Sequence, residues 1–185
     1  MVRELMQEAE SRMRESVSAL ESDLQSFRTG RASPHLLDRI EVEMYGATLP
    51  LNQLASISVP EPQQLGVRPY DQNSIGAIEK AILKSDLGLT PNNDGKIIRL
   101  NIPRLTEERR RDLTKLVGKR VEEAKVAVRN IRRDTLNDLR EMLEEKMISE
   151  NQFYLSQDDL QTLTDKYSGD VDEVGKKKEI EIMEV

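Results

Sequence analysis

The chain has 185 residues and a formal net charge of −6, enough length to bury one sizeable hydrophobic core or two small ones. Charged residues make up 34% and aromatic residues only 3%, a balance typical of long helices with charged outer faces. There is no cysteine and no apolar run of the roughly 20 residues that span a bilayer, which excludes disulfides, thiolate metal sites, cysteine nucleophiles and membrane-spanning helices.

The first segment predicts a helix that runs to about Arg28. From Met13 to Phe27 its apolar residues recur at steps of three and four, which is typical of a narrow apolar seam. We expect Gly30 to provide a left-handed C-terminal cap and Pro34 to prevent the helix from continuing.

Residues 31–104 differ in texture and predict a small α+β module. All seven prolines lie here. Alternating or β-rich patterns predict strands at 40–44, 54–59 and 96–102, and Asn93-Asp94-Gly95 predicts a turn before the last of them. The apolar face of residues 74–86 predicts a short helix that is closed by Gly88.

After Pro103 the helical pattern resumes and continues to about Ile148. Thr106 is the expected N-cap of a helix of about 40 residues. Ser156, with Asp159 three residues later, resembles a capping box at the start of a last helix. No single helix can bury its seam alone, so the three long helices predict a bundle.

The predicted fold class is therefore α+β: an elongated three-helix bundle with a small β/α/β domain inserted between helices 1 and 2. We expect the bundle to contain residues 1–30 and 105–185 and the inserted domain to contain 31–104. The chain then crosses between the domains twice, near 29–31 and 102–105. We expect these crossings to act as hinges at Gly30, Pro103 and Arg104.

The long helix carries the main functional signal. Between Arg104 and Asp134, eleven Lys/Arg residues stand against six acids, a local net charge of +5 in an acidic chain. On a helical wheel, the basic residues of its C-terminal half lie opposite the apolar seam, so they predict a solvent-facing stripe for a phosphate-rich partner. Lys125, Arg129, Arg132 and Arg133 have only Asp134 as a close acidic neighbour in the following sequence.

Other function classes have less support. A solvated face held by i,i+4 ion pairs is the plain alternative for the basic helix. His35 is the only histidine, so neither a metal site nor a nucleophilic triad is expected. We expect no catalytic residue and no cofactor.

Four segments together resemble the bacterial ribosome recycling factor family. They are residues 28–34 (RTGRASP), 85–89 (SDLGL), 105–110 (LTEERR) and 125–134 (KVAVRNIRRD), and the likeness extends over essentially the whole chain. The resemblance implies an L-shaped molecule in which a three-helix bundle carries a small inserted β/α/β domain.

The resemblance also implies the function. Family members bind the large ribosomal subunit after termination and, with elongation factor G and GTP, split ribosomes into subunits, releasing mRNA and tRNA. The family's rRNA contacts correspond to Arg28, Arg31, Arg129 and Arg132, and the charge pattern adds Arg110 and Arg133. GTP hydrolysis belongs to the partner, so we expect a monomeric, cytoplasmic protein that is not an enzyme and has no membrane partner.

Two other classes remain open. One is a general structured-RNA-binding helical protein that acts without a GTPase. The other is a coiled-coil interaction protein whose basic face is only solvated.

Overall fold

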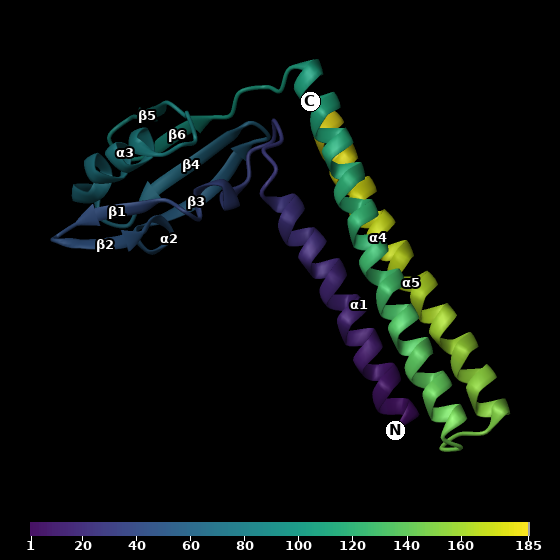
Figure 1. The fold of residues 1–185 in the computed structure, drawn as a ribbon. Helices are drawn as coiled ribbons and strands as arrows, with labels where there is room; N and C mark the ends of the chain where they lie inside the picture. The colour runs from purple at the N-terminus through teal and green to yellow at the C-terminus, as the bar shows by residue number, and fades with distance from the viewer. Residues whose placement is uncertain (185) are drawn as a thin grey trace. The chain divides into compact units, whose positions relative to one another are not determined.

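The computed structural model describes residues 1–184, which form two compact units (Figure 1). The first, called the bundle, contains Met1–Gln25 and Arg111–Met183; the second, called the small unit, contains Ser26–Arg110 and Glu184. Long helices make up the bundle and antiparallel strands dominate the small unit. The predicted α+β class, with a small module inserted after the first of three long helices, is confirmed.

Three helices form the bundle: α1 (Val2–Gln25), α4 (Glu107–Glu144) and α5 (Glu150–Met183). They lie side by side, with α4 antiparallel to its two neighbours (Figure 1). Each helix buries one apolar stripe in a shared core, which offsets the entropy of ordering such long elements. The buried residues include Met13, Leu20 and Leu24 of α1, Leu113, Val117, Val128, Ile131 and Leu139 of α4, and Phe153, Leu160, Tyr167, Val171 and Ile182 of α5.

The side chain of Val121 on α4 packs against the backbone of α5 at Gly175. A Cβ atom at Gly175 would lie 2.4 Å from Cγ2 of Val121, closer than any unstrained carbon contact. Because valine is stiff at χ1, it has little freedom to move aside. A glycine within α5 is therefore explained by the Val121 side chain that occupies the space a Cβ atom would need.

The first helix ends earlier than predicted, and the expected cap at Gly30 is wrong. Helix α1 stops at Gln25, and the glycines with positive φ are Gly46, Gly88 and Gly95. Gly30 instead lies against the second crossing, where a Cβ atom would be 3.5 Å from the Leu105 nitrogen. A Cβ atom there would make only ordinary van der Waals contacts, so neither φ nor the available space explains why this residue is glycine.

The helix N-caps were predicted with mixed success. Thr106 accepts a hydrogen bond from the Arg109 amide at 3.1 Å, which confirms it as the cap of α4. The predicted capping box at Ser156 is wrong, because Ser156 is buried inside α5. Ser149 and Gln152 form the box instead: the Gln152 amide donates to the Ser149 hydroxyl at 3.2 Å, and the Ser149 amide donates to the Gln152 side chain at 2.9 Å.

A four-stranded antiparallel sheet is the centre of the small unit. In spatial order its strands are β3 (Ala55–Glu61), β4 (Gln64–Pro69), β6 (Ile98–Asn101) and β5 (Pro91–Asn93). A separate hairpin pairs β1 (Glu41–Met44) with β2 (Ala47–Pro50), and α3 (Ile75–Lys84) packs beside β1 and β5. Three short helical segments complete the unit: α2 (Leu51–Leu54) and the 3-10 helices Pro34–Leu37 and Gln72–Ser74. Its core includes Leu37, Val42, Leu51, Leu65, Val67, Ile78, Ile82, Ile98 and Leu100.

The predicted strands correspond to β1, β3 and β6, whereas β2, β4 and β5 were not predicted. Strand β4 contains Gly66 and ends at Pro69, residues that usually weaken a strand pattern. Gly66 fits the close packing there, since a Cβ atom would lie 2.9 Å from the Ser58 hydroxyl on β3 and would force that side chain to move. Close strand packing therefore overrides local propensity.

The turn between β5 and β6 depends on Asp94, as the Asn93-Asp94-Gly95 pattern predicted. Its Oδ1 accepts hydrogen bonds from the Ile97 and Lys96 amides at 2.8 and 2.9 Å. Both hydrogen bonds lower the pKa of Asp94, and the bond from the Ile97 amide has the larger effect. Because the folded pKa is depressed, the stabilisation is present above the unfolded value of about 4 and is lost as the pH falls through the folded value.

The Gly175→Ala variant is expected to be less stable than the native protein by about 1–3 kcal/mol, because the added methyl overpacks the contact with Val121. Gly169→Ala is the matched control on the same helix, since no atom lies within 4 Å of its Cβ position. The control should gain up to about 1 kcal/mol from helix propensity. Urea unfolding followed by circular dichroism measures both; equal changes in the two variants would contradict the packing explanation.

The Asp94→Asn variant should unfold more readily than the native small unit near neutral pH. This difference should shrink as the pH falls from about 4, where Asp94 of the unfolded chain becomes protonated, through the lowered pKa of the folded protein. Hydrogen exchange of the Lys96 and Ile97 amides at several pH values reports on the turn directly. A difference that is independent of pH would show that the carboxylate charge does not stabilise the turn.

Candidate nucleic-acid interface

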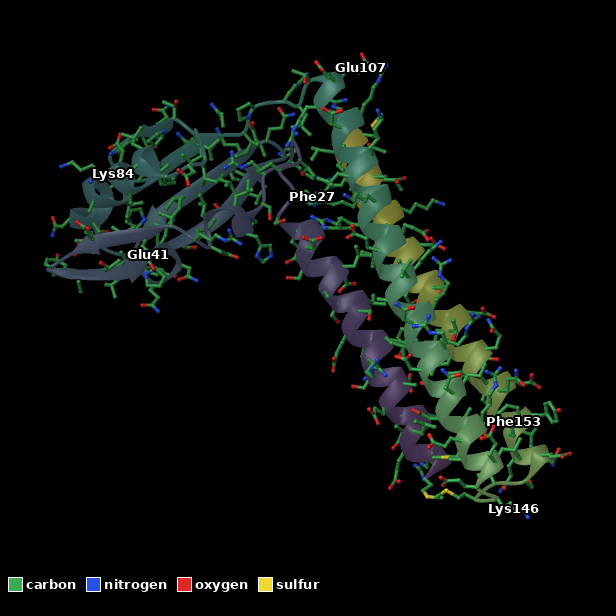
Figure 2. All side chains as sticks on the ribbon, viewed as in Figure 1. Phe27, Glu41, Lys84, Glu107, Lys146 and Phe153 are labelled. Carbon is green, nitrogen blue, oxygen red and sulfur yellow. The ribbon has the colours of Figure 1, made fainter. Side chains whose placement is uncertain are left out.

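The predicted site residues fall into two groups, one in each compact unit. Arg129, Arg132 and Arg133 lie within five consecutive residues of α4 in the bundle. Arg28 and Arg31 belong to the small unit, as does Arg110 near the start of α4. Figure 2 labels Glu107 at that end of α4 and Lys146 in the turn at the other end.

The bundle arginines are accessible but are not isolated cations. Arg129 and Arg133 are exposed and Arg132 is half-buried. Arg129 Nη2 lies 2.5 Å from Glu122 Oε1, and Arg133 Nε lies 4.0 Å from Asp134 Oδ1. These side chains are partnered and still reach solvent.

Asp134 is the close acidic neighbour in the following sequence, and the fold adds acidic partners from elsewhere. Lys125 Nζ lies 2.6 Å from Asp172 Oδ1 on α5, and Glu122 on the preceding turns of α4 reaches Arg129. Inspection of nearby sequence misses Asp172 because the helix packing, rather than chain proximity, brings it to Lys125. The basic stripe is therefore partly neutralised within the free protein.

Arg132 differs from its neighbours in the charge of its acceptor. Its Nη1 donates to Oε1 of Gln161 at 3.1 Å, and Nε2 of Gln161 donates to Oδ1 of Asp165 at 2.8 Å. Gln161 and Asp165 are one turn apart on α5. Sequence reasoning did not single out Gln161; only the register of α5 against α4 identifies it.

Arg28 has a structural role within the small unit. Its Nη1 donates to the Leu87 carbonyl at 3.2 Å and its Nη2 donates to the Asp86 carbonyl at 3.0 Å. These carbonyls follow the C-terminal end of α3, where a positive charge is favourable. The two segments 28–34 and 85–89, which were singled out separately in the sequence, therefore contact each other.

The two predicted crossings both lie within the small unit and are hydrogen-bonded to the same turn of its sheet. The first crossing (26–33) donates from the Ala32 amide to the Pro62 carbonyl at 2.8 Å, and the second (102–106) donates from the Ile102 amide to the Gln63 carbonyl at 2.8 Å. Arg104 Nε also donates to the Gln63 side chain at 3.5 Å. The predicted hinge residues Gly30, Pro103 and Arg104 thus lie in crossings that are joined through the turn between β3 and β4.

The remaining predicted site residues lie at exposed or half-buried positions. Arg31 is exposed, with Nη1 3.6 Å from Glu184 Oε2, and Arg110 is half-buried. His35 is exposed, with Nδ1 3.0 Å from Asp38. Residues 1–184 contain no group of three His, Cys, Asp or Glu side chains arranged to hold a metal ion. Over the same residues, no helix is long and apolar enough to cross a membrane.

Comparison with known proteins gives one consistent result. A family model described as ribosome recycling factor matches residues 20–183. The ribosome-recycling factors of Roseiflexus castenholzii and Halalkalibacterium halodurans are each 56% identical to this chain, and each alignment covers 100% of both proteins.

Solved structures agree. A solution structure of the ribosome recycling factor matches with a TM-score of 0.77 and 42% identity, covering 100% of this chain and 98% of that one. A second match has a TM-score of 0.67 and 45% identity and covers 100% of both chains. It is described as models for the T. thermophilus ribosome recycling factor and the E. coli elongation factor G bound to the E. coli post-termination complex.

The Arg28→Ala variant should loosen residues 85–89, because two charge-assisted hydrogen bonds to the Asp86 and Leu87 carbonyls are lost. Since the side chain is exposed, we expect a loss of only about 1 kcal/mol in local stability. Hydrogen exchange of the 85–89 amides measures it, with Arg31→Ala as the control of equal charge. Unchanged protection in the Arg28 variant would show that the contact does not order this loop.

Proposed function

Because the chain belongs to the ribosome recycling factor family, we propose that it binds the large subunit of the post-termination ribosome and, with elongation factor G and GTP, splits the ribosome into subunits. Splitting releases the mRNA and the tRNA. The observation that carries this function is the family match over residues 20–183, supported by relatives that align over their full lengths. The solved relative with elongation factor G on a post-termination complex supports the choice of both partners.

The bundle arginines are the proposed rRNA contacts. Arg129, Arg132 and Arg133 present guanidinium groups on the solvent side of a rigid helix, where planar forks can engage phosphate oxygens in pairs. Helix α4 contains no aromatic residue on which bases could stack. Its chemistry therefore favours the backbone and shape of folded RNA over single-stranded sequence.

The small-unit arginines form a second proposed contact group. The group consists of Arg28, Arg31 and Arg110. The guanidinium of Arg28 has five N–H donors, and its contacts with two carbonyl oxygens use only some of them. One Arg28 side chain could thus keep the 85–89 loop in place and still offer N–H groups to a phosphate. This double use favours a contact that depends on an intact small unit.

The remaining parts of the proposal concern movement and chemistry. Gly30, Pro103 and Arg104 are the proposed hinge, and the small unit receives the action of elongation factor G. The chain supplies binding and force transmission, while its GTPase partner supplies hydrolysis. We place this activity in the cytoplasm and assign it to a monomer.

The decisive assay is the splitting of purified post-termination ribosomes into subunits. The chain should promote splitting only when elongation factor G and GTP are both present. Splitting or RNA rearrangement without the GTPase would instead identify a general structured-RNA-binding protein. Failure to split ribosomes with all components present would reject the recycling function.

The Arg132→Ala variant should bind large ribosomal subunits at least about tenfold more weakly, because a charge-assisted phosphate contact is lost. Its helix content and thermal stability should change little, since the side chain lies outside the apolar core. Lys177→Ala removes one positive charge from exposed α5 and is the matched control. Equal binding losses in the two variants would argue for a general charge effect rather than a site at Arg132.

A further inference from the structure

The three bundle arginines differ in what holds them in the free protein. Arg129 is held by the carboxylate of Glu122, and Arg133 lies beside that of Asp134. Arg132 is held by the neutral amide oxygen of Gln161. Its side chain is thus fixed in position while its charge is left without a carboxylate partner within 4.0 Å among residues 1–184.

The direction of the Gln161 amide is set by a second contact. Its NH₂ group donates to Asp165 at 2.8 Å, which leaves the oxygen toward Arg132. The reversed amide would place its N–H donors against the guanidinium and its oxygen against a carboxylate, so that both hydrogen bonds would be lost. Asp165 therefore determines that Gln161 accepts from Arg132.

The amide also separates two opposite charges. The hydrogen bonds run from Arg132 to Gln161 and from Gln161 to Asp165, so the carboxylate of Asp165 contacts Gln161 and not Arg132. A direct exposed ion pair would favour the paired over the free guanidinium by a factor of about two to five. That pair would have to break before a phosphate could bind. A neutral acceptor orders the side chain and leaves that competition small.

We propose that Gln161 is a positioning residue for rRNA binding: it holds Arg132 in place for a backbone phosphate without neutralising it. This inference rests on the proposed function, since it assumes that Arg132 contacts rRNA. It distinguishes the three arginines by role. Arg132 contributes a full, pre-oriented charge, whereas Arg129 must first exchange its carboxylate for a phosphate.

The test compares variants at Gln161 for binding of the full-length protein to purified large ribosomal subunits over a series of salt concentrations. Gln161→Glu keeps the shape and the acceptor but adds a carboxylate beside Arg132. We expect binding about three- to tenfold weaker, because the new ion pair competes with the phosphate. The salt dependence should fall by about one counterion, because the released carboxylate takes up a cation as the phosphate binds.

Two comparisons separate this effect from a change in total charge or in fold. Gln7→Glu makes the same substitution at an exposed position on α1 and should change affinity less than about twofold. Gln161→Ala removes the orienting acceptor and adds no charge, so it should weaken binding modestly with an unchanged salt dependence. Circular dichroism should show the same helix content in every variant.

A double-mutant cycle with Arg132→Ala decides the matter. In that background Gln161→Glu should have no more effect than Gln7→Glu, because the side chain that it neutralises is gone. An equal loss in both backgrounds, or a Gln161→Glu variant that matches Gln7→Glu, would overturn the role of Gln161. If Arg132→Ala alone binds large subunits normally, then Arg132 is not an rRNA contact and the role of Gln161 fails with it. Weak binding by Arg132→Ala together with normal binding by Gln161→Glu would reject only the role of Gln161.

Discussion

The packing of Val121 on α4 against Gly175 on α5 is the contact on which the facing surface of these two helices depends. Because Gly175 has no side chain, the Val121 side chain packs directly over the α5 backbone. That contact sets the register of α5 against α4. Lys125 meets Asp172 and Arg132 meets Gln161 because of this register. A core contact therefore controls the chemistry presented on the outside.

The same packing explains how an acidic chain tolerates a strongly basic helix. Carboxylates from α1, α4 and α5 neutralise several of its cations, including Arg120 through Asp23 and Lys125 through Asp172. A polyanion then meets a surface on which some cations are already paired with carboxylates of the protein and others are available to bind it. Such a pattern limits indiscriminate adhesion to nucleic acid and favours a partner whose phosphates match the available positions.

Local signals in the sequence predict the fold well and the contacts poorly. Apolar periodicity identified all three long helices, and Thr106 was recognisable as a cap because its partner is three residues away. Ser156 resembled a cap equally well, but burial in the bundle overrode the pattern. The carbonyl contacts of Arg28 and the position of Gln161 depend on residues 58, 59 and 29 positions apart, so only the folded chain reveals them.

The two crossings also bear on how the chain can assemble. They meet where Gly30 lies against Leu105, and both are hydrogen-bonded to the turn at Pro62 and Gln63. Once folded, the small unit thus brings its own ends together and acts as a short, closed loop between α1 and α4. Loop-closure entropy depends on the free chain length, so the inserted residues add little to the entropic cost of pairing those helices. An insertion of this kind makes a connection that is long in sequence short in space.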